Sequence, residues 1–249
     1  MSLSTSRRLY HRARRVLRQR WLGVSVAFTG NAIPRQCNFS VAIPHPILIL
    51  QGFGTTRRGL LILEQRLRRD GYHVFSLRLG GLFGTLNTRT IDALARHVGE
   101  KIASLRRRYR LGKVTIIGHS KGGLVGRYLV ACLGGAEHCD RLITLGTPHQ
   151  GYPTRQIMRV AALGLVMPSI RQMRPTSRLF RLLQEAGPLE EIECVSIYST
   201  ADHIAPAQYC HWRGNEHWAP HNIVLAGLSH SDYLIKQRAY EALVQFLPK

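Results

Sequence analysis

The chain has 249 residues, of which 45% are hydrophobic and 20% charged, as in ordinary globular proteins. This composition excludes collagen-like and largely disordered chains, and no apolar run reaches the roughly 18–20 residues that a membrane-spanning helix needs. Lysine and arginine total 35 against 14 acidic residues, so the net charge is +21, which suits anionic lipids, nucleic acids or acidic substrates but is equally compatible with solvated arginine-rich faces.

The first part of the chain, residues 1–45, is a strongly basic arm. Its segment 7–20 holds seven arginines and no acidic residue. We interpret it as a basic amphipathic helix, because Tyr10, Leu17 and Trp21 fall near one face. Such a helix would bind an anionic membrane surface, so a cytoplasmic or peripherally membrane-associated protein is expected. A weak N-terminal export signal is the alternative.

From residue 46 onward, predicted strands and helices alternate. The apolar runs predict strands at 46–50, 72–77, 113–118, 141–146, 193–199 and 222–227. Amphipathic or capped runs predict helices at 57–69, 88–108, 121–133 and 232–247. Alternating βα units imply an α/β fold, with a mostly parallel central sheet that carries helices on both faces.

Residues 152–191 interrupt this alternation because they are too long for a simple crossover between strands. They include a predicted helix that begins near Ser177. The segment is either an ordinary packed helical pair or a small helical cap over the carboxyl edge of the sheet, where open α/β sheets bind ligands. We favour the cap. The predicted organisation is therefore an arm over 1–45 and a domain over 46–249 that carries the cap insertion.

A candidate nucleophile lies in the run Gly118-His119-Ser120-Lys121-Gly122, which matches G-x-S-x-G between a predicted strand and a predicted helix. In that context the turn is so tight that the serine adopts a strained backbone, and side chains at the two glycines would strike the strand or the helix. The hydroxyl of Ser120 then projects clear of the backbone. The N–H of Lys121, at the helix start, points at the same spot and can bind a developing oxyanion.

A serine hydroxyl needs a base, and chain order selects one among the twelve histidines. In this strand–elbow–helix arrangement the order is serine, acid, histidine. Asp202 follows a predicted strand 82 residues after Ser120, and His230 follows the next strand 28 residues later. We expect His230 to take the serine proton and Asp202 to hold its tautomer. The competing acid, Asp232, is interpreted as a first-turn carboxylate of the closing helix.

The second oxyanion donor is expected in the loop after the first strand. Gly52 lets the chain turn there, and the N–H of Phe53 can then face the serine. A plain glycine turn is the alternative.

Five further residues are candidates for the substrate pocket. His149 follows the 141–146 strand, and His203 follows the predicted acid. Leu163 and Leu165 belong to the apolar run of the predicted cap. His119 lies inside the elbow, and we interpret it as structural because its side chain points away from the hydroxyl.

The stretches "ILILQGFG", "VTIIGHSKGG", "LITLGTPHQG", "VSIYSTADHIAP" and "LAGLSHSDYL" resemble the α/β-hydrolase fold, and specifically bacterial lipases and esterases of the triacylglycerol lipase kind. They occur in family order over residues 46–247, about four-fifths of the chain. The family often has His-Gly at the oxyanion loop, where this chain has Gln51-Gly52. Because the donor is a backbone N–H, the substitution is compatible with the same role.

The resemblance implies a serine hydrolase that cleaves carboxylic esters of lipids or other hydrophobic acyl groups through an acyl-enzyme, without a metal or organic cofactor. Two alternatives remain: an acyltransferase or thioesterase that uses the same triad, and a non-catalytic membrane-binding protein on a hydrolase scaffold. The complete set Ser120, Asp202 and His230 argues against the scaffold. No nucleic-acid partner is expected, because neither a zinc finger nor an aromatic-interleaved RNA-binding pattern occurs.

Overall fold

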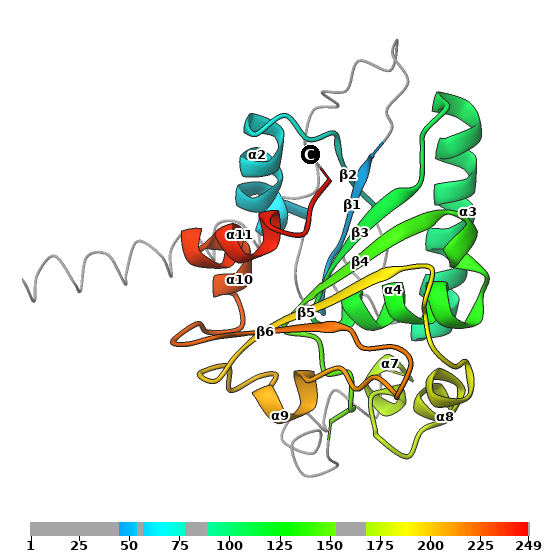
Figure 1. Ribbon diagram of the computed structural model, residues 1–249, viewed down its shortest axis with the longest axis vertical. Helices are drawn as coiled ribbons and strands as arrows, with labels where there is room; N and C mark the ends of the chain where they lie inside the picture. Colours follow the sequence, from blue (N-terminus) through cyan, green and yellow to red (C-terminus); the bar gives the residue numbers. More distant parts are fainter. Residues whose placement is uncertain (1–44, 54–56, 78–88, 153–167, 249) are drawn as a thin grey trace, which may run out of the picture.

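A six-stranded parallel sheet forms the centre of the fold (Figure 1). The computed structural model describes residues 45–53, 57–77, 89–152 and 168–248. The spatial order of the strands is β2-β1-β3-β4-β5-β6, and every pair is parallel. The strands are β1 (Ile47–Leu50), β2 (Val74–Ser76), β3 (Val114–His119), β4 (Cys139–Leu145), β5 (Glu193–Ser199) and β6 (His221–Leu225). The predicted sheet is confirmed.

Helices cover both faces of the sheet, as the alternation predicts. The described helices are η1 (Arg57–Leu60), α2 (Leu61–Arg69), α3 (Ile91–Tyr109), α4 (Lys121–Cys132), η2 (Gly135–Glu137), α7 (Pro168–Gln172), α8 (Arg178–Glu185), α9 (Ala207–Cys210), α10 (Asp232–Ile235) and α11 (Gln237–Val244). Figure 1 shows α2, α10 and α11 on one side of the sheet and α3 and α4 on the other.

The core has two hydrophobic layers, one on each face of the sheet. Strand β1 contributes Ile47 and Ile49 to the layer under α2, α10 and α11, and Leu48 and Leu50 to the layer under α3, α4 and α8. Successive side chains of a strand point to opposite faces. A strand between two helix layers therefore has to be apolar at every position, which is why these strands appear as continuous apolar runs.

Two helices differ from their predicted bounds for identifiable reasons. Helix α3 begins at Ile91 because Thr90 caps it, accepting a hydrogen bond from the Ala93 N–H at 3.4 Å. The predicted closing helix is two helices, because Lys236 adopts an extended backbone with φ −83° and ψ 138°. The second of these helices is held against α2, since Tyr240 of α11 donates a hydrogen bond to Asp70 at the end of α2 at 2.6 Å.

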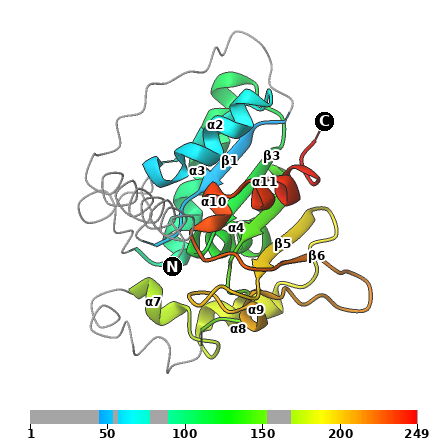
Figure 2. The ribbon, with the colours of Figure 1, turned by 90° about the vertical axis from the view of Figure 1, so that its left-hand side faces the viewer.

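The described part of the interrupting segment holds α7 and α8. With α9 they lie at one end of the molecule (Figures 1 and 2). Helix α8 packs Leu179, Phe180 and Leu183 into the layer under α4, as an ordinary packed helix would. Helix α7 instead places Ile170 against Phe53 at the carboxyl edge of the sheet. The cap remains a prediction that α7 alone supports by its position.

Several predictions fall on residues outside the described part. The basic arm up to residue 44 lies there, as do residues 153–167 with Leu163 and Leu165. Among the described helices, none has the length and apolarity to cross a membrane.

Candidate active site

Ser120 occupies a strained turn between β3 and α4. Its backbone has φ 53° and ψ −122°, a conformation that costs a non-glycine residue on the order of 1–3 kcal/mol. Hydrogen bonds hold it there. Its N–H donates to the Leu145 carbonyl at 2.9 Å, and its carbonyl accepts from the Thr147 hydroxyl at 2.9 Å and the Gly123 N–H at 3.0 Å. The chain around the end of β4 therefore fixes the elbow, a role of Thr147 that the sequence did not reveal.

The loop after β1 lies directly against this elbow. A Cβ at Gly122 would overlap the carbonyl oxygen of Leu50, and one at Gly52 would lie 2.9 Å from the Ser120 Cβ. Only glycine allows so close an approach at these two positions. The Phe53 N–H, one residue further, donates to no acceptor among the described residues. The predicted oxyanion loop is thus adjacent to the serine.

Asp202 and His230 form a hydrogen-bonded pair in the loops after β5 and β6. His230 Nδ1 lies 2.8 Å from Asp202 Oδ2, while Oδ1 of the same carboxylate accepts from the N–H groups of Ile204 and Ala205, both at 2.9 Å. Burial alone would raise the pKa of Asp202, but the His230 bond, the His230 charge and the two N–H donors hold it below its usual range. A carboxylate only accepts, so Nδ1 carries the proton and Nε2 is left as a base.

Two aromatic rings position His230. Burial, with a smaller contribution from His230, lowers the pKa of His119 to about 3, so its ring is neutral. It donates its single N–H, on Nε2, to the His230 carbonyl at 2.9 Å, and its ring centroid lies 4.8 Å from that of His230. Tyr233 packs edge-on against His230 at 6.3 Å. This arrangement agrees with a structural role for His119.

No hydrogen bond joins the Ser120 hydroxyl to His230 among the described residues. Such bonds are often long in free enzymes and tighten when substrate binds.

A buried serine joins the loops that carry the acid and the base. The Ser199 hydroxyl, at the end of β5, accepts from the N–H groups of Ala201 at 3.2 Å and Leu228 at 3.1 Å. The first belongs to the Asp202 loop and the second to the His230 loop. A polar residue that ends an apolar strand was the only sequence signal for this role.

The side chain of Lys121 lies beneath α7. It is 1% exposed, its Nζ donates to the Ser169 hydroxyl at 3.4 Å, and it lies 5.5 Å from the Phe53 ring centroid. Burial lowers its pKa to about 8. The lysine thereby connects α7 to the oxyanion loop, a contact that the sequence did not indicate.

The palmitoyl protein thioesterase family matches residues 46–246, a segment that includes Ser120, Asp202 and His230. The chain belongs to the palmitoyl protein thioesterase family. It is therefore a carboxylic ester hydrolase of the lipase/esterase type, and the predicted family resemblance is confirmed. No protein of the curated set matches the chain.

Solved structures similar to this thioesterase-family chain are lipases and esterases. The mature lipase BlEst2 of Bacillus licheniformis superposes with a TM-score of 0.69 at 12% identity, covering 88% of this chain and 100% of that one. Aspergillus fumigatus lipase B gives 0.66 at 17% identity, covering 84% and 53%. A lipase-esterase related protein of Clostridium acetobutylicum gives 0.63 at 13% identity, covering 84% and 96%. At such identities the likeness establishes the α/β-hydrolase fold.

The histidines predicted for the pocket of this thioesterase-family chain lie in three different surroundings. His119 is buried beneath His230. His149 is also buried and stacks on Trp212 with ring centroids 4.1 Å apart. His203 is exposed beside the acid. No group of three or more metal-ligating side chains is suitably placed in the described ranges, and the expected absence of a cofactor stays a prediction.

Proposed function

We propose that the chain hydrolyses thioesters or oxygen esters of hydrophobic acyl groups through an acyl-enzyme on Ser120. The observation that carries the proposal is the 2.8 Å hydrogen bond between His230 and Asp202, formed close to a serine held at φ 53°. This bond leaves His230 Nε2 as the base that a serine hydroxyl needs. The family match supports ester cleavage but leaves these residue roles as our proposal.

In the first half of the reaction, His230 Nε2 takes the hydroxyl proton as Ser120 Oγ bonds to the acyl carbon. The carbonyl oxygen becomes an oxyanion, which accepts hydrogen bonds from the N–H groups of Phe53 and Lys121. Collapse of this intermediate breaks the C–S or C–O bond, and the leaving thiol or alcohol takes the proton from His230. Asp202 stabilises the imidazolium in between.

In the second half, water attacks the acyl-enzyme. His230 takes a proton from the water, the second oxyanion forms in the same site, and its collapse returns the proton to Ser120 Oγ and releases the carboxylic acid. Transfer of the acyl group to an alcohol or thiol would use the same intermediate. The family match favours water as the acceptor.

A hydrophobic acyl group is favoured by the apolar surface at this edge of the sheet. Phe53, Tyr152 and Ile170 pack together beside the elbow. Ile204, two residues after Asp202, is 62% exposed and adds apolar surface near these residues. The thioester alternative comes from the family match.

Active-site labelling tests the proposal most directly. A fluorophosphonate probe is expected to modify Ser120, identified by peptide mass spectrometry, and not the Ser120→Ala variant. Ser104→Ala, an exposed serine of α3, is the matched control and should label normally. Matched palmitoyl, octanoyl and acetyl esters and thioesters would then rank the substrates, with the acetyl compounds turned over most slowly. Labelling elsewhere, or full turnover by Ser120→Ala, would contradict the assignment.

We also propose that the basic arm holds the enzyme at anionic membranes. Each arginine near such a surface contributes on the order of 1 kcal/mol, and segment 7–20 holds seven. Deleting residues 1–20 should weaken co-sedimentation with phosphatidylserine vesicles, and high salt should weaken it for the full chain. Turnover of a soluble ester should persist, because no predicted catalytic residue lies there. Equal binding by the deletion variant would disprove the arm's role.

A further inference from the structure

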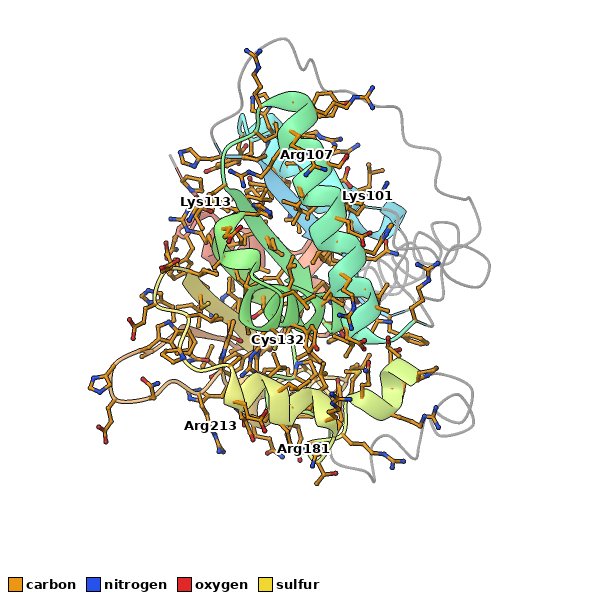
Figure 3. The ribbon with its side chains drawn as sticks, turned by 90° about the vertical axis from the view of Figure 1, so that its right-hand side faces the viewer. Lys101, Arg107, Lys113, Cys132, Arg181 and Arg213 are labelled. Atoms are coloured by element: carbon orange, nitrogen blue, oxygen red, sulfur yellow. The ribbon has the colours of Figure 1, made fainter. Side chains whose placement is uncertain are left out.

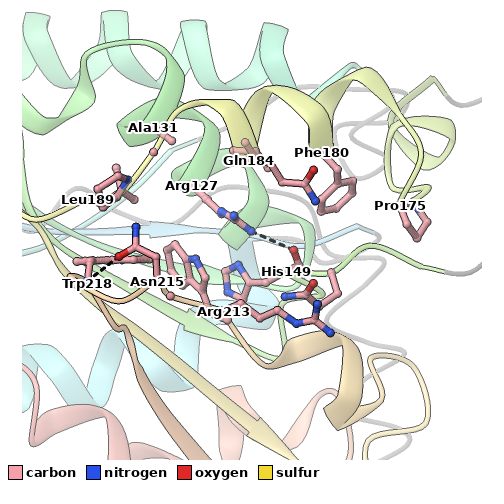
Figure 4. A pocket seen from close by; sticks show the side chains of 16 residues that line it. Arg127, Ala131, His149, Pro175, Phe180, Gln184, Leu189, Arg213, Asn215 and Trp218 are labelled. Carbon is pink, nitrogen blue, oxygen red and sulfur yellow. Dashed lines mark hydrogen bonds between the residues drawn. The ribbon is translucent and has the colours of Figure 1, made fainter.

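A cavity lies away from the predicted nucleophile, between α4, α8 and the segment before β6 (Figure 4). Its volume of about 370 Å³ falls within the roughly 300–1,000 Å³ of small-molecule pockets. Ser120, Asp202 and His230 are absent from its lining. Arg127, which points into it, follows Ser120 by seven residues and therefore lies about 10 Å further along α4.

The guanidinium of Arg127 is fixed in place. Its Nη1 donates to the His149 carbonyl at 3.0 Å, and its Cζ lies 5.1 Å from the Trp212 ring centroid. The backbone of Trp212 is held by the Asn222 side chain, which accepts a hydrogen bond from the Trp212 backbone N–H at 2.8 Å and donates one to its carbonyl at 2.9 Å. A ligand of Arg127 would therefore meet a side chain whose orientation is already set, which lowers the entropic cost of binding.

Arg127 lacks an acidic partner. All 14 acidic side chains of the sequence fall within the described ranges, and none forms an ion pair with Arg127 there. No acidic residue lines the cavity, whereas a second arginine, Arg213, lies at its exposed rim. Burial lowers the pKa of Arg127 only to about 10, so it is charged at neutral pH. Because the side chain is partly buried, an anion that binds it is attracted more strongly than it would be by a solvated arginine.

Apolar side chains also line the cavity, and Leu189 and Trp218 are partly exposed in it. Phe180 and Leu183 of α8 are 3% and 4% exposed, and Trp212 and Trp218 meet edge-on at 5.9 Å. The cavity thus combines a cationic end with an apolar wall. A guanidinium presents two parallel N–H donors that match the two oxygens of a carboxylate.

We propose that this cavity binds a carboxylate-bearing amphiphile, with the carboxylate on Arg127, Arg213 at the rim, and the apolar body against Leu189 and Trp218. The site is separate from the predicted triad, and the proposal does not rest on the function of Ser120.

Calorimetric titration of the full chain with sodium octanoate tests this site. Three compounds serve as controls: octanol lacks the negative charge, octylamine carries a positive charge instead, and acetate lacks the alkyl chain. Octanoate should bind, and the other three should bind more weakly on the order of tenfold or more, since a charged hydrogen bond or the apolar contact is lost. Octanol binding as tightly as octanoate would overturn the carboxylate assignment, as would the absence of octanoate binding.

Variants locate the site. Arg127→Gln should weaken octanoate binding on the order of tenfold or more, and Arg127→Lys should weaken it less. Arg107 is an exposed arginine of α3, far from the cavity in Figure 3. The control variant Arg107→Gln loses the same charge there and should bind octanoate as wild type does. Octanoate should raise the melting temperature of wild type and Arg107→Gln but not that of Arg127→Gln. Unchanged binding in Arg127→Gln would refute the proposal.

Two further measurements separate binding at the Arg127 cavity from binding at the triad. Gln184→Glu adds a negative charge at an exposed lining position, where it should not affect folding, and should weaken octanoate binding several-fold. Gln245→Glu, exposed at the end of α11, is its control and should have no effect. Prior modification of Ser120 by a fluorophosphonate should leave octanoate binding intact. Loss of binding after that modification would place the ligand in the triad site and overturn the second site.

Discussion

Helix α4 carries two sites whose electrostatics differ. Ser120 precedes its first residue, and the carboxylate of the predicted acid, Asp202, accepts hydrogen bonds from His230 and two backbone N–H groups. Two turns further, Arg127 has a backbone carbonyl and an aromatic face but no acidic side chain. The hydrogen-bonded pair of Asp202 and His230 suits transient proton transfer. The permanent charge of Arg127, which has no acidic partner, suits the binding of an anion. In a chain of net charge +21, Arg127 is distinguished by being partly buried at a cavity without an acidic partner.

The largest expected effect is a loss of ester turnover that leaves octanoate binding at the Arg127 cavity unchanged. Ser120→Ala and His230→Ala should each lower ester turnover by at least about 10⁴-fold, and the double variant should be little worse, because the two residues act as one unit. Both single variants should still bind octanoate, since neither residue lines the Arg127 cavity. Initial rates with octanoyl esters and calorimetry measure the two properties. Additive losses in the double variant would contradict a shared mechanism.

The choice of acid gives the next largest effect. Asp202→Asn should lower turnover by on the order of 10³–10⁴-fold, because asparagine stabilises the wrong tautomer and not the imidazolium. Asp232→Asn is the matched control: its Oδ2 accepts from the Ser229 N–H at the start of α10, and its loss should change turnover little. Steady-state kinetics on both variants decide between them. Inactivation by Asp232→Asn alone would show that the acid is misassigned.

Gly123→Ala should disturb the turn at Ser120 without changing the Arg127 cavity. The new Cβ would overlap the Thr147 hydroxyl, which holds the Ser120 carbonyl. We expect the free energy of unfolding to fall by about 2–3 kcal/mol, measured by urea denaturation, with turnover falling as well.

A double-mutant cycle tests the cause of that loss. Gly123→Ala combined with Thr147→Ala should be less destabilised than the sum of the two single changes. Gly134→Ala is the control, since its φ is +69° but no atom lies within 4 Å of the added Cβ, and it should cost only about 1 kcal/mol. Strict additivity in the cycle would exclude the contact as the cause.

The smallest effect concerns the other buried cation of α4. Burial lowers the pKa of Lys121 from 10.5 to about 8, so between these pH values the unfolded chain binds more protons than the folded one. Wild-type stability should therefore rise with pH from 8 to 10.5, whereas below pH 8 both states are protonated and the cost of burial is complete. Lys121→Met should then be more stable than wild type by about 1–2 kcal/mol at pH 7, because lost contacts offset part of the gain.

Melting temperatures at pH 7, 9 and 10.5 would test this prediction. The difference between Lys121→Met and wild type should shrink as pH rises. Lys113→Met, at an exposed position before β3, should show no such trend. A constant difference for Lys121→Met across this range would show that burial of its charge is not the source of the effect.

Local pattern was enough to predict the elements and the elbow. G-x-S-x-G between an apolar run and a helical run predicted a strand, a tight turn and a helix, and the structure has β3, a serine at φ 53° and α4. Parallel strands bring their carboxyl ends to one edge, so chain order was enough to predict that Asp202 and His230 lie together.

Some side chains have partners that the sequence does not indicate. The predicted helix start near Ser177 is confirmed, but the Ser177 hydroxyl donates to the Gln172 carbonyl at 2.6 Å and does not cap α8. His149 lines the Arg127 cavity, while its place at the edge of the substrate pocket stays a prediction. In both cases, the nearest partner in space is set by the packing of other elements.

The amino-acid sequence by itself determined the alternation of strands and helices, the tight turn at Ser120, and the pairing of Asp202 with His230, because these depend on short-range periodicity and on the order of parallel strands. Only the tertiary structure decided that Thr147 fixes the elbow, that Ser199 joins the loops of the acid and the base, and that Arg127 lies on Trp212 without an acid. Those arrangements bring together residues that are far apart in the chain, and their geometry exists only once the helices have packed on the sheet.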